Sequence, residues 1–128
     1  TGAFSPLWTA MELADPDPVY QAALRRAGRE AVIERHDKLE AMIEQMPYLV
    51  GDRPTLADAL FVGVARWLDI HEVTDRERWP RLSALRRRLE ADPAVAYATA
   101  LEEGRDAPPS NACLGHVSLA DVIERFGT

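Results

Sequence analysis

Histidine and cysteine side chains are the first candidates for metal binding or nucleophilic chemistry in this chain. The segment His71-Glu72-Val73-Thr74-Asp75 comes close to the H-E-x-x-H motif of zinc proteases, in which two histidines one helical turn apart bind the metal and the glutamate acts as the base. Asp75 stands where the second histidine is needed, and no third ligand is obvious nearby. We therefore expect exposed polar loop residues here, and no metal site.

Two further reactive side chains have non-catalytic interpretations. His36 lies on the apolar stripe of an expected helix and could shuttle protons, but no base partner is near it in sequence, so we expect a hydrogen-bonded core or interface histidine. Cys113 has no partner cysteine and no adjacent basic residue that would lower its pKa. A single cysteine fits a reducing compartment and predicts a cytoplasmic location. We predict no catalytic residue in the chain.

Three aromatic residues are more suggestive of a binding site. Phe4 and Trp8 lie on one face of an expected first helix, and Trp67 lies near the end of an expected central helix. Such residues could line an apolar pocket between helices, which is the usual kind of site in helical bundles. Ordinary core packing remains the alternative for each of them.

The composition limits the class of protein that could hold these residues. The 128 residues are enough for one compact domain, and 47% apolar with 28% charged residues supports a buried core. The net charge of -6 and the scattered basic residues argue against a nucleic-acid partner. The most apolar stretch, 56–68, is shorter than the roughly 20 residues that cross a bilayer, so we expect no membrane partner.

Apolar residues recur every three to four positions along the chain, which predicts an all-α fold without strands. Asp17-Pro18 and Asp92-Pro93 combine an N-cap residue with a proline in the first turn, and Pro47 ends the long second helix. The expected helices cover 3–14, 18–46, 56–68, a segment after Pro80, a segment from Pro93 to Gly104, and 118–127. In the helix after Pro80 we expect Arg86, Arg87 and Arg88 to be mostly solvated.

The central helix, 56–68, carries the most specific local signals. Thr55-Leu56-Ala57-Asp58 has the form of a capping box, in which the threonine and aspartate side chains each bond to the other's backbone amide. Because only Asp58 and Arg66 are polar within the helix, we expect it to be buried on nearly every side. Gly28 predicts a close approach of another segment, and Gly51 a backbone conformation that a side chain would disfavour.

The order of these pieces resembles the helical C-terminal domain of cytosolic glutathione S-transferases, and most of all the bacterial beta class. The resemblance covers roughly residues 3–104. It rests on Phe4-Ser5-Pro6-Leu7, Tyr48-Leu49-Val50-Gly51-Asp52, Thr55-Leu56-Ala57-Asp58-Ala59, Ala65-Arg66-Trp67, Trp79-Pro80, Pro93-Ala94-Val95 and Glu103-Gly104.

The resemblance implies a glutathione S-transferase C-terminal-like helical bundle at 1–104, followed by a tail with a short helix at 105–128. It implies that Phe4, Trp8 and Trp67 line the pocket for a small apolar electrophile, that Thr55 and Asp58 are structural, and that the domain forms part of a homodimer interface. Glutathione, the family's co-substrate, binds mainly to an N-terminal thioredoxin-like domain that has no counterpart in this sequence. The chain alone is therefore expected to be inactive as a transferase.

A second function from another class fits the same resemblance. The chain could be a stand-alone interaction module without catalysis, of the kind that helps to assemble translation factors and synthetases. In either case we expect Leu119, Val122 and Phe126 of the tail to dock over the pocket mouth or over a groove.

Overall fold

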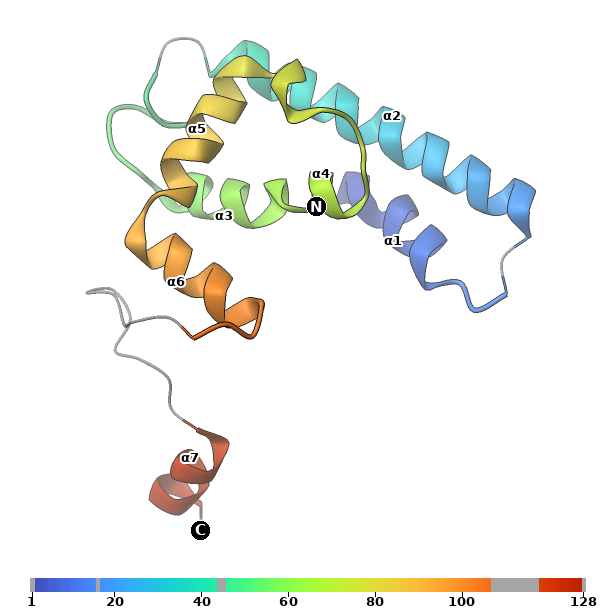
Figure 1. The fold of residues 1–128 in the computed structure, drawn as a ribbon. Helices are drawn as coiled ribbons and strands as arrows, with labels where there is room; N and C mark the ends of the chain where they lie inside the picture. Colours follow the sequence, from blue (N-terminus) through green and yellow to red (C-terminus); the bar gives the residue numbers. More distant parts are fainter. Residues whose placement is uncertain (1, 16, 44–45, 107–117, 128) are drawn as a thin grey trace. The chain divides into compact units, whose positions relative to one another are not determined.

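The computed structural model describes residues 2–15, 17–43, 46–106 and 118–127, and these are helical or irregular throughout (Figure 1). Within these ranges the only strand-like pairing is an isolated bridge between Tyr48 and Gly51. The chain forms two compact units, residues 1–89 and 90–128, which are described separately here. The all-α prediction is therefore confirmed for the described residues.

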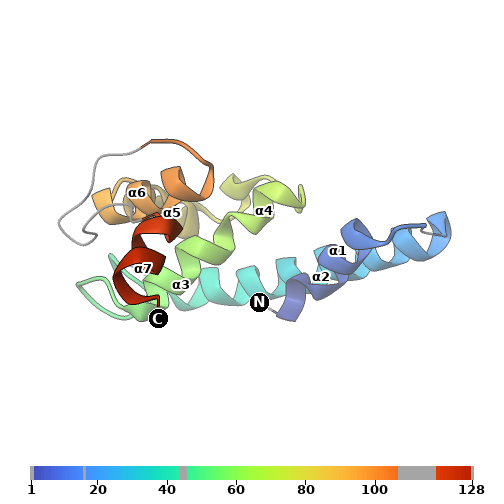
Figure 2. The same cartoon turned by 90° about the horizontal axis from the view of Figure 1, so that it is seen from below.

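The first unit begins with two antiparallel helical segments. A short 3-10 turn, η1 (Gly2–Phe4), runs into α1 (Ser5–Glu12), and α2 (Pro18–Met42) returns alongside it (Figures 1 and 2). The Asp17 side chain caps α2 by accepting from the backbone N–H groups of Val19 and Tyr20, at 2.7 and 3.1 Å. Both helices end earlier than expected, α1 at Glu12 and α2 at Met42.

Gly28 marks the closest contact between α1 and α2. A Cβ atom built on Gly28 would lie 2.6 Å from the Cγ atom of Leu7 and 3.2 Å from its backbone nitrogen. The predicted close approach is confirmed, because only a residue without a side chain leaves room for Leu7 at this point.

The capping box that begins α3 (Leu56–Ala65) is formed as predicted. The Asp58 carboxylate accepts hydrogen bonds from the Thr55 backbone N–H at 2.8 Å and from the Thr55 hydroxyl at 2.9 Å. Its other oxygen accepts from the Leu49 N–H at 2.9 Å, so the same side chain also holds the preceding loop. Gly51 in that loop has a φ of 101°, which confirms the predicted glycine-specific conformation.

Two expectations for the central helix are wrong. The helix breaks at Arg66, and a separate turn, α4 (Trp67–Ile70), follows it. One face of α3 is also open, because Leu56 is 86% exposed and Leu60 is 63% exposed. An all-apolar sequence is compatible with burial on any side, so the pattern itself could not reveal which side is covered.

The end of α4 shows a Schellman motif with a glutamate in the position that usually holds glycine. The Val73 N–H donates to the Leu68 carbonyl at 3.0 Å, and the Glu72 N–H donates to the Asp69 carbonyl at 3.1 Å. Glu72 takes a φ of 48°, in the left-handed region that disfavours residues with a side chain. Val73 and Leu68 are both buried, as the hydrophobic contact of this motif requires.

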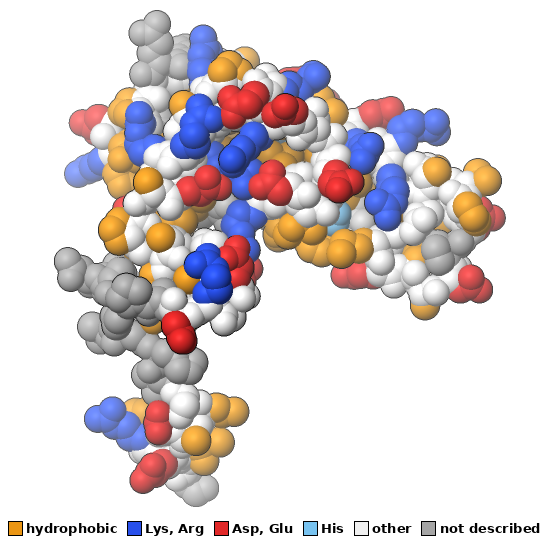
Figure 3. All heavy atoms as spheres, in the orientation of Figure 1, with side chains coloured by type: hydrophobic (Ala, Val, Ile, Leu, Met, Phe, Trp, Pro, Cys, Tyr) orange, Lys and Arg blue, Asp and Glu red, His pale blue; other side chains and the backbone are white. Residues whose placement is uncertain are grey.

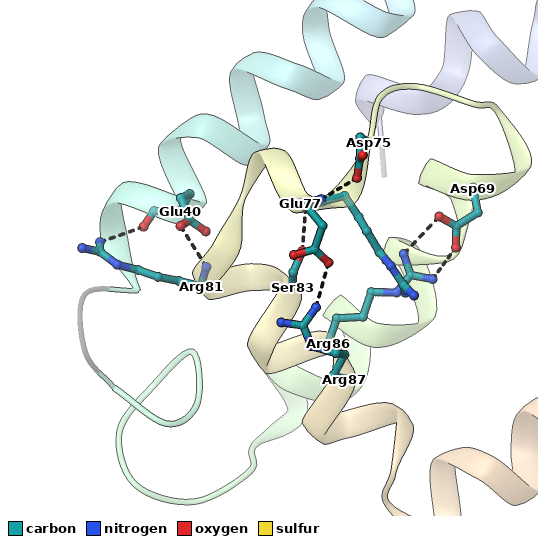
Figure 4. A network of polar contacts seen from close by, with 9 residues as sticks. Glu40, Asp69, Asp75, Glu77, Arg81, Ser83, Arg86 and Arg87 are labelled. Atoms are coloured by element: carbon teal, nitrogen blue, oxygen red, sulfur yellow. Dashed lines mark hydrogen bonds and ion pairs between the residues drawn. The ribbon is translucent and has the colours of Figure 1, made fainter.

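A carboxylate on α2 caps α5 (Pro80–Glu90) at its N-terminus, where the preceding residue is Trp79. The Glu40 side chain accepts from the backbone N–H groups of Arg81 and Leu82, at 3.0 and 2.9 Å (Figure 4). Asp37, one turn earlier on α2, accepts from the Trp79 indole N–H at 2.7 Å. These bonds join α2 to the segment that begins α5.

Arg86 corrects the prediction of a solvated arginine cluster. It is only 5% exposed, whereas Arg87 and Arg88 are exposed. Its guanidinium donates to the Asp69 carboxylate at 2.5 Å (Figure 4). It also donates to the Ala65 carbonyl at 3.1 Å, and so spans the break between α3 and α4. The partners that make its burial possible are 17 and 21 residues away in sequence.

The second unit contains α6 (Pro93–Glu102), which begins at the predicted Asp92 cap, and α7 (Leu119–Phe126). The Asp92 side chain accepts from the Ala94 N–H at 2.8 Å, and the Ser118 hydroxyl oxygen accepts from the Asp121 N–H at 3.1 Å. The apolar side chains of α7 that were expected to dock, Leu119, Val122 and Phe126, are all exposed. Cys113 lies outside the described residues.

Candidate functional site

The three aromatic residues singled out from the sequence meet in one cluster in the first unit. Trp67, the first residue of α4, contacts Phe4 and Trp8 edge-to-face, with ring centroids 5.4 and 5.6 Å apart. Phe4 is buried, while Trp8 and Trp67 are half-buried. Phe4 and Trp8 are one helical turn apart and so share a face of the η1–α1 segment, which is why both can reach the same indole. We call these three residues and His71 the aromatic cluster.

His71 is the member of the aromatic cluster that the sequence did not reveal. It is 7% exposed, so the expectation of an exposed loop residue is wrong. Its ring lies edge-to-face with Trp8 at 4.4 Å between centroids, and 6.0 Å from the ring of Phe4. The spacing of four residues between Trp67 and His71 was the available signal, since it places both on one side of a helical turn.

The surroundings of His71 favour the neutral imidazole. Burial lowers the pKa of His71 below its usual value, and the positive charge of Arg25 on α2 lowers it further. Its Nε2 atom is buried and has no hydrogen-bond partner among the described residues. The aromatic cluster therefore contains a buried polar atom that has no hydrogen-bond partner among the described residues.

A second buried histidine lies on another side of Phe4. His36, on α2, has its ring centroid 6.4 Å from that of Phe4 and packs at 4.8 Å against Trp79. Its Nδ1 atom bonds to the Val32 carbonyl at 2.9 Å, which confirms the prediction of a hydrogen-bonded core histidine. Burial lowers the pKa of His36, and the bond to Val32 opposes that shift without reversing it.

One hollow of the first unit includes a residue of the aromatic cluster. It has a volume of about 390 Å³, and Phe4, Val32, His36 and Val64 form much of its wall. Trp8 and Trp67 are not among the residues that line it. The structure thus brings the three predicted residues together and places Phe4 between their contact and this hollow.

Other kinds of site are not found in the part of the chain that the structure describes. No group of three or more histidine, cysteine, aspartate or glutamate residues within 2–15, 17–43, 46–106 and 118–127 could hold a metal ion. Across the same ranges, no helix has the length and apolar character to cross a membrane. On the face drawn in Figure 3, acidic and basic side chains are interspersed over the first unit, without a stripe of one sign.

These features define an all-helical domain organised around a capped apolar helix, with an aromatic cluster beside the end of that helix. A family model described as glutathione S-transferase, C-terminal domain, matches residues 7–93, which is more than half of the chain. The chain belongs to this family, which implies glutathione as co-substrate. Comparison with curated proteins gives no significant match, and neither does comparison with solved structures.

Proposed function

We propose that this chain forms the wall of an apolar pocket in a glutathione transferase and binds the electrophilic co-substrate there. The observation that carries this proposal is the contact of Trp67 with both Phe4 and Trp8. Three aromatic rings from two separate helical segments meet edge-to-face, and two of them keep part of their surface open to solvent. Half-open indoles offer a flat apolar surface to a planar ligand.

The contribution of this surface to the reaction would be desolvation and orientation. In the complete enzyme the glutathione thiolate attacks the electrophile, and binding of the electrophile against the indoles would hold its reacting carbon in place and exclude water. No residue of the described ranges is assigned a catalytic role, so the chain by itself should not turn over an aromatic halide. We place the protein in the cytoplasm, by family and by its single cysteine.

The open face of α3 supports the proposal that a further domain covers this one. Leu56 and Leu60 lie one helical turn apart and are 86% and 63% exposed, on a helix whose other face forms the core. Exposed leucines in this arrangement are typical of an interface. A thioredoxin-like partner domain that carries the main glutathione site would account for them, and we also propose a homodimer, as is common in this family.

The test is the binding of 1,3-dinitrobenzene, an unreactive analogue of aromatic halide electrophiles, measured by equilibrium dialysis against the chain. Trp8→Ala and Trp67→Ala should each weaken binding roughly threefold to tenfold, because each removes a stacking surface. Tyr20→Ala is the matched control, since Tyr20 is an exposed aromatic residue of α2 outside the aromatic cluster. Equal binding by all four proteins would refute the pocket.

The interaction-module alternative has one observation in its favour, which is the same open face of α3. A module would use this face to bind another protein without any need for the aromatic cluster. Retention of dinitrobenzene binding in a Leu56→Glu, Leu60→Glu double variant, together with its loss in Trp8→Ala, would separate the pocket from the docking face and favour the transferase function.

A further inference from the structure

An unsatisfied buried nitrogen is the feature of the first unit that packing alone does not explain. Native proteins rarely bury a polar atom without a partner, because this costs about 1–3 kcal/mol. His71 is more than nine-tenths buried, and of its two ring nitrogens only Nε2 is a buried atom without a partner among the described residues. The unpartnered atom belongs to a residue of the aromatic cluster.

No neighbour of His71 within the described residues forms a hydrogen bond with Nε2. The rings that pack against it are those of Trp8 and Phe4. A buried N–H without an acceptor is rarer in proteins than an acceptor with unused capacity. We therefore assign the imidazole proton to Nδ1, which leaves a free lone pair on Nε2.

Trp8 is the half-buried neighbour of His71 in the aromatic cluster. Its ring centroid is 4.4 Å from that of His71, and Trp8 is half-buried. Within the described residues, the Trp8 side chain is held by ring contacts with Trp67 and His71, and its indole N–H donates no hydrogen bond. A ligand could reach Nε2 if the Trp8 side chain moved away from His71, a motion that would break its ring contacts with Trp67 and His71.

We infer that Nε2 of His71 accepts a hydrogen bond from the bound co-substrate and so selects aromatic ligands that carry an N–H or O–H donor. This inference rests on the proposed pocket and adds to it the chemistry of the preferred ligand. The donor would be a phenol, indole or anilide group whose ring lies against the indoles of Trp8 and Trp67. His71 would act as a specificity-determining residue with no part in bond making.

The expected preference follows from the energy of one hydrogen bond. A site that offers a buried acceptor favours a ligand with a matching donor over an isostere without it, because the isostere leaves the acceptor unsatisfied. For a neutral acceptor the preference should be roughly threefold to tenfold in Kd. Ligands of equal shape and area isolate this effect from hydrophobic burial.

The experiment compares indole with benzofuran, which has the same shape but no N–H donor, on the 128-residue chain. The Kd values come from NMR titration, and the ¹⁵N shifts of the imidazole report the hydrogen bond directly in the wild-type protein. His71→Phe keeps a ring of similar shape and removes the acceptor. His36→Phe is the matched control, because His36 is also buried and contacts Phe4 but has its own bond to Val32.

The inference predicts that indole binds at least threefold more tightly than benzofuran to wild type and to His36→Phe, and equally to His71→Phe. It also predicts that indole shifts the Nε2 resonance of His71 and that benzofuran does not. If both ligands bind wild type equally and Trp8→Ala weakens the binding of both to the same extent, the role of His71 is overturned and the pocket remains. An unchanged Nε2 resonance with indole bound would do the same. If neither ligand binds, the pocket itself is overturned, and the role of His71 with it.

Discussion

Replacing Asp58 with alanine should destabilise this domain more than removal of any exposed carboxylate. The side chain is completely buried and accepts three hydrogen bonds, from the Leu49 N–H, the Thr55 N–H and the Thr55 hydroxyl. In Asp58→Ala two backbone N–H groups lose their acceptor, at about 1–3 kcal/mol each. Water that enters the vacated space recovers part of this, so we expect a loss of about 3 kcal/mol in the free energy of unfolding.

Urea denaturation followed by circular dichroism gives this free energy, and a loss of that size corresponds to a fall in Tm of roughly 10 °C. Asp52→Ala is the matched control, because Asp52 is an exposed carboxylate in the preceding loop and its removal should change stability by less than about 0.5 kcal/mol. Asp58→Asn keeps the shape and turns one acceptor into a donor that faces a backbone N–H, so it should lose about half as much as the alanine variant. A loss below 1 kcal/mol in Asp58→Ala would refute the structural role of the capping box.

The same residue predicts how the difference between wild type and Asp58→Ala depends on pH. Burial by itself would raise the pKa of Asp58, but the hydrogen bonds from Leu49 and Thr55 outweigh it and lower the pKa. A carboxyl whose pKa is lower in the folded state contributes stability above its unfolded pKa of about 4 and loses it as the pH falls further. The two unfolding free energies should therefore converge below about pH 4. A constant difference down to pH 2 would contradict the assignment.

Three further predictions follow from the backbone and the buried histidines. Gly28→Ala should lower the free energy of unfolding in urea by about 1–3 kcal/mol, because its Cβ meets a leucine of α1. Gly63→Ala has open space around the new Cβ and should raise the free energy of unfolding by up to about 1 kcal/mol. The reverse order of stability would contradict the close approach at Gly28. Glu72→Gly should raise the free energy of unfolding by about 1 kcal/mol by relieving a left-handed φ of 48°, and no gain would mean that the glutamate makes a compensating contact. Folding lowers the pKa values of His36 and His71, so the unfolded chain binds more protons and stability should fall as the pH drops below about 6.5. Thermal melts between pH 7.5 and 5.5 test this. The double variant His36→Phe, His71→Phe should lose most of the pH dependence.

The local signals in the sequence were sufficient for the helix starts and for the special glycines. Asp17 and Asp92 cap their helices as predicted, and each of these bonds joins residues two positions apart. The Thr55–Asp58 box has the same short range. Propensity and capping act within one helical turn, so the sequence alone contains the whole interaction. The ordered set of motifs was likewise enough to indicate the family.

The tertiary structure decided which side chains are buried and what they meet. The burial of Arg86 depends on Asp69 and the Ala65 carbonyl, and the burial of His71 depends on an aromatic residue of α1 that lies 63 positions earlier in the chain. The sequence also could not predict which face of α3 is open, since a helix with apolar residues on every side has no periodicity that marks its covered face. Contacts between distant segments are set by packing geometry, and no local pattern records them.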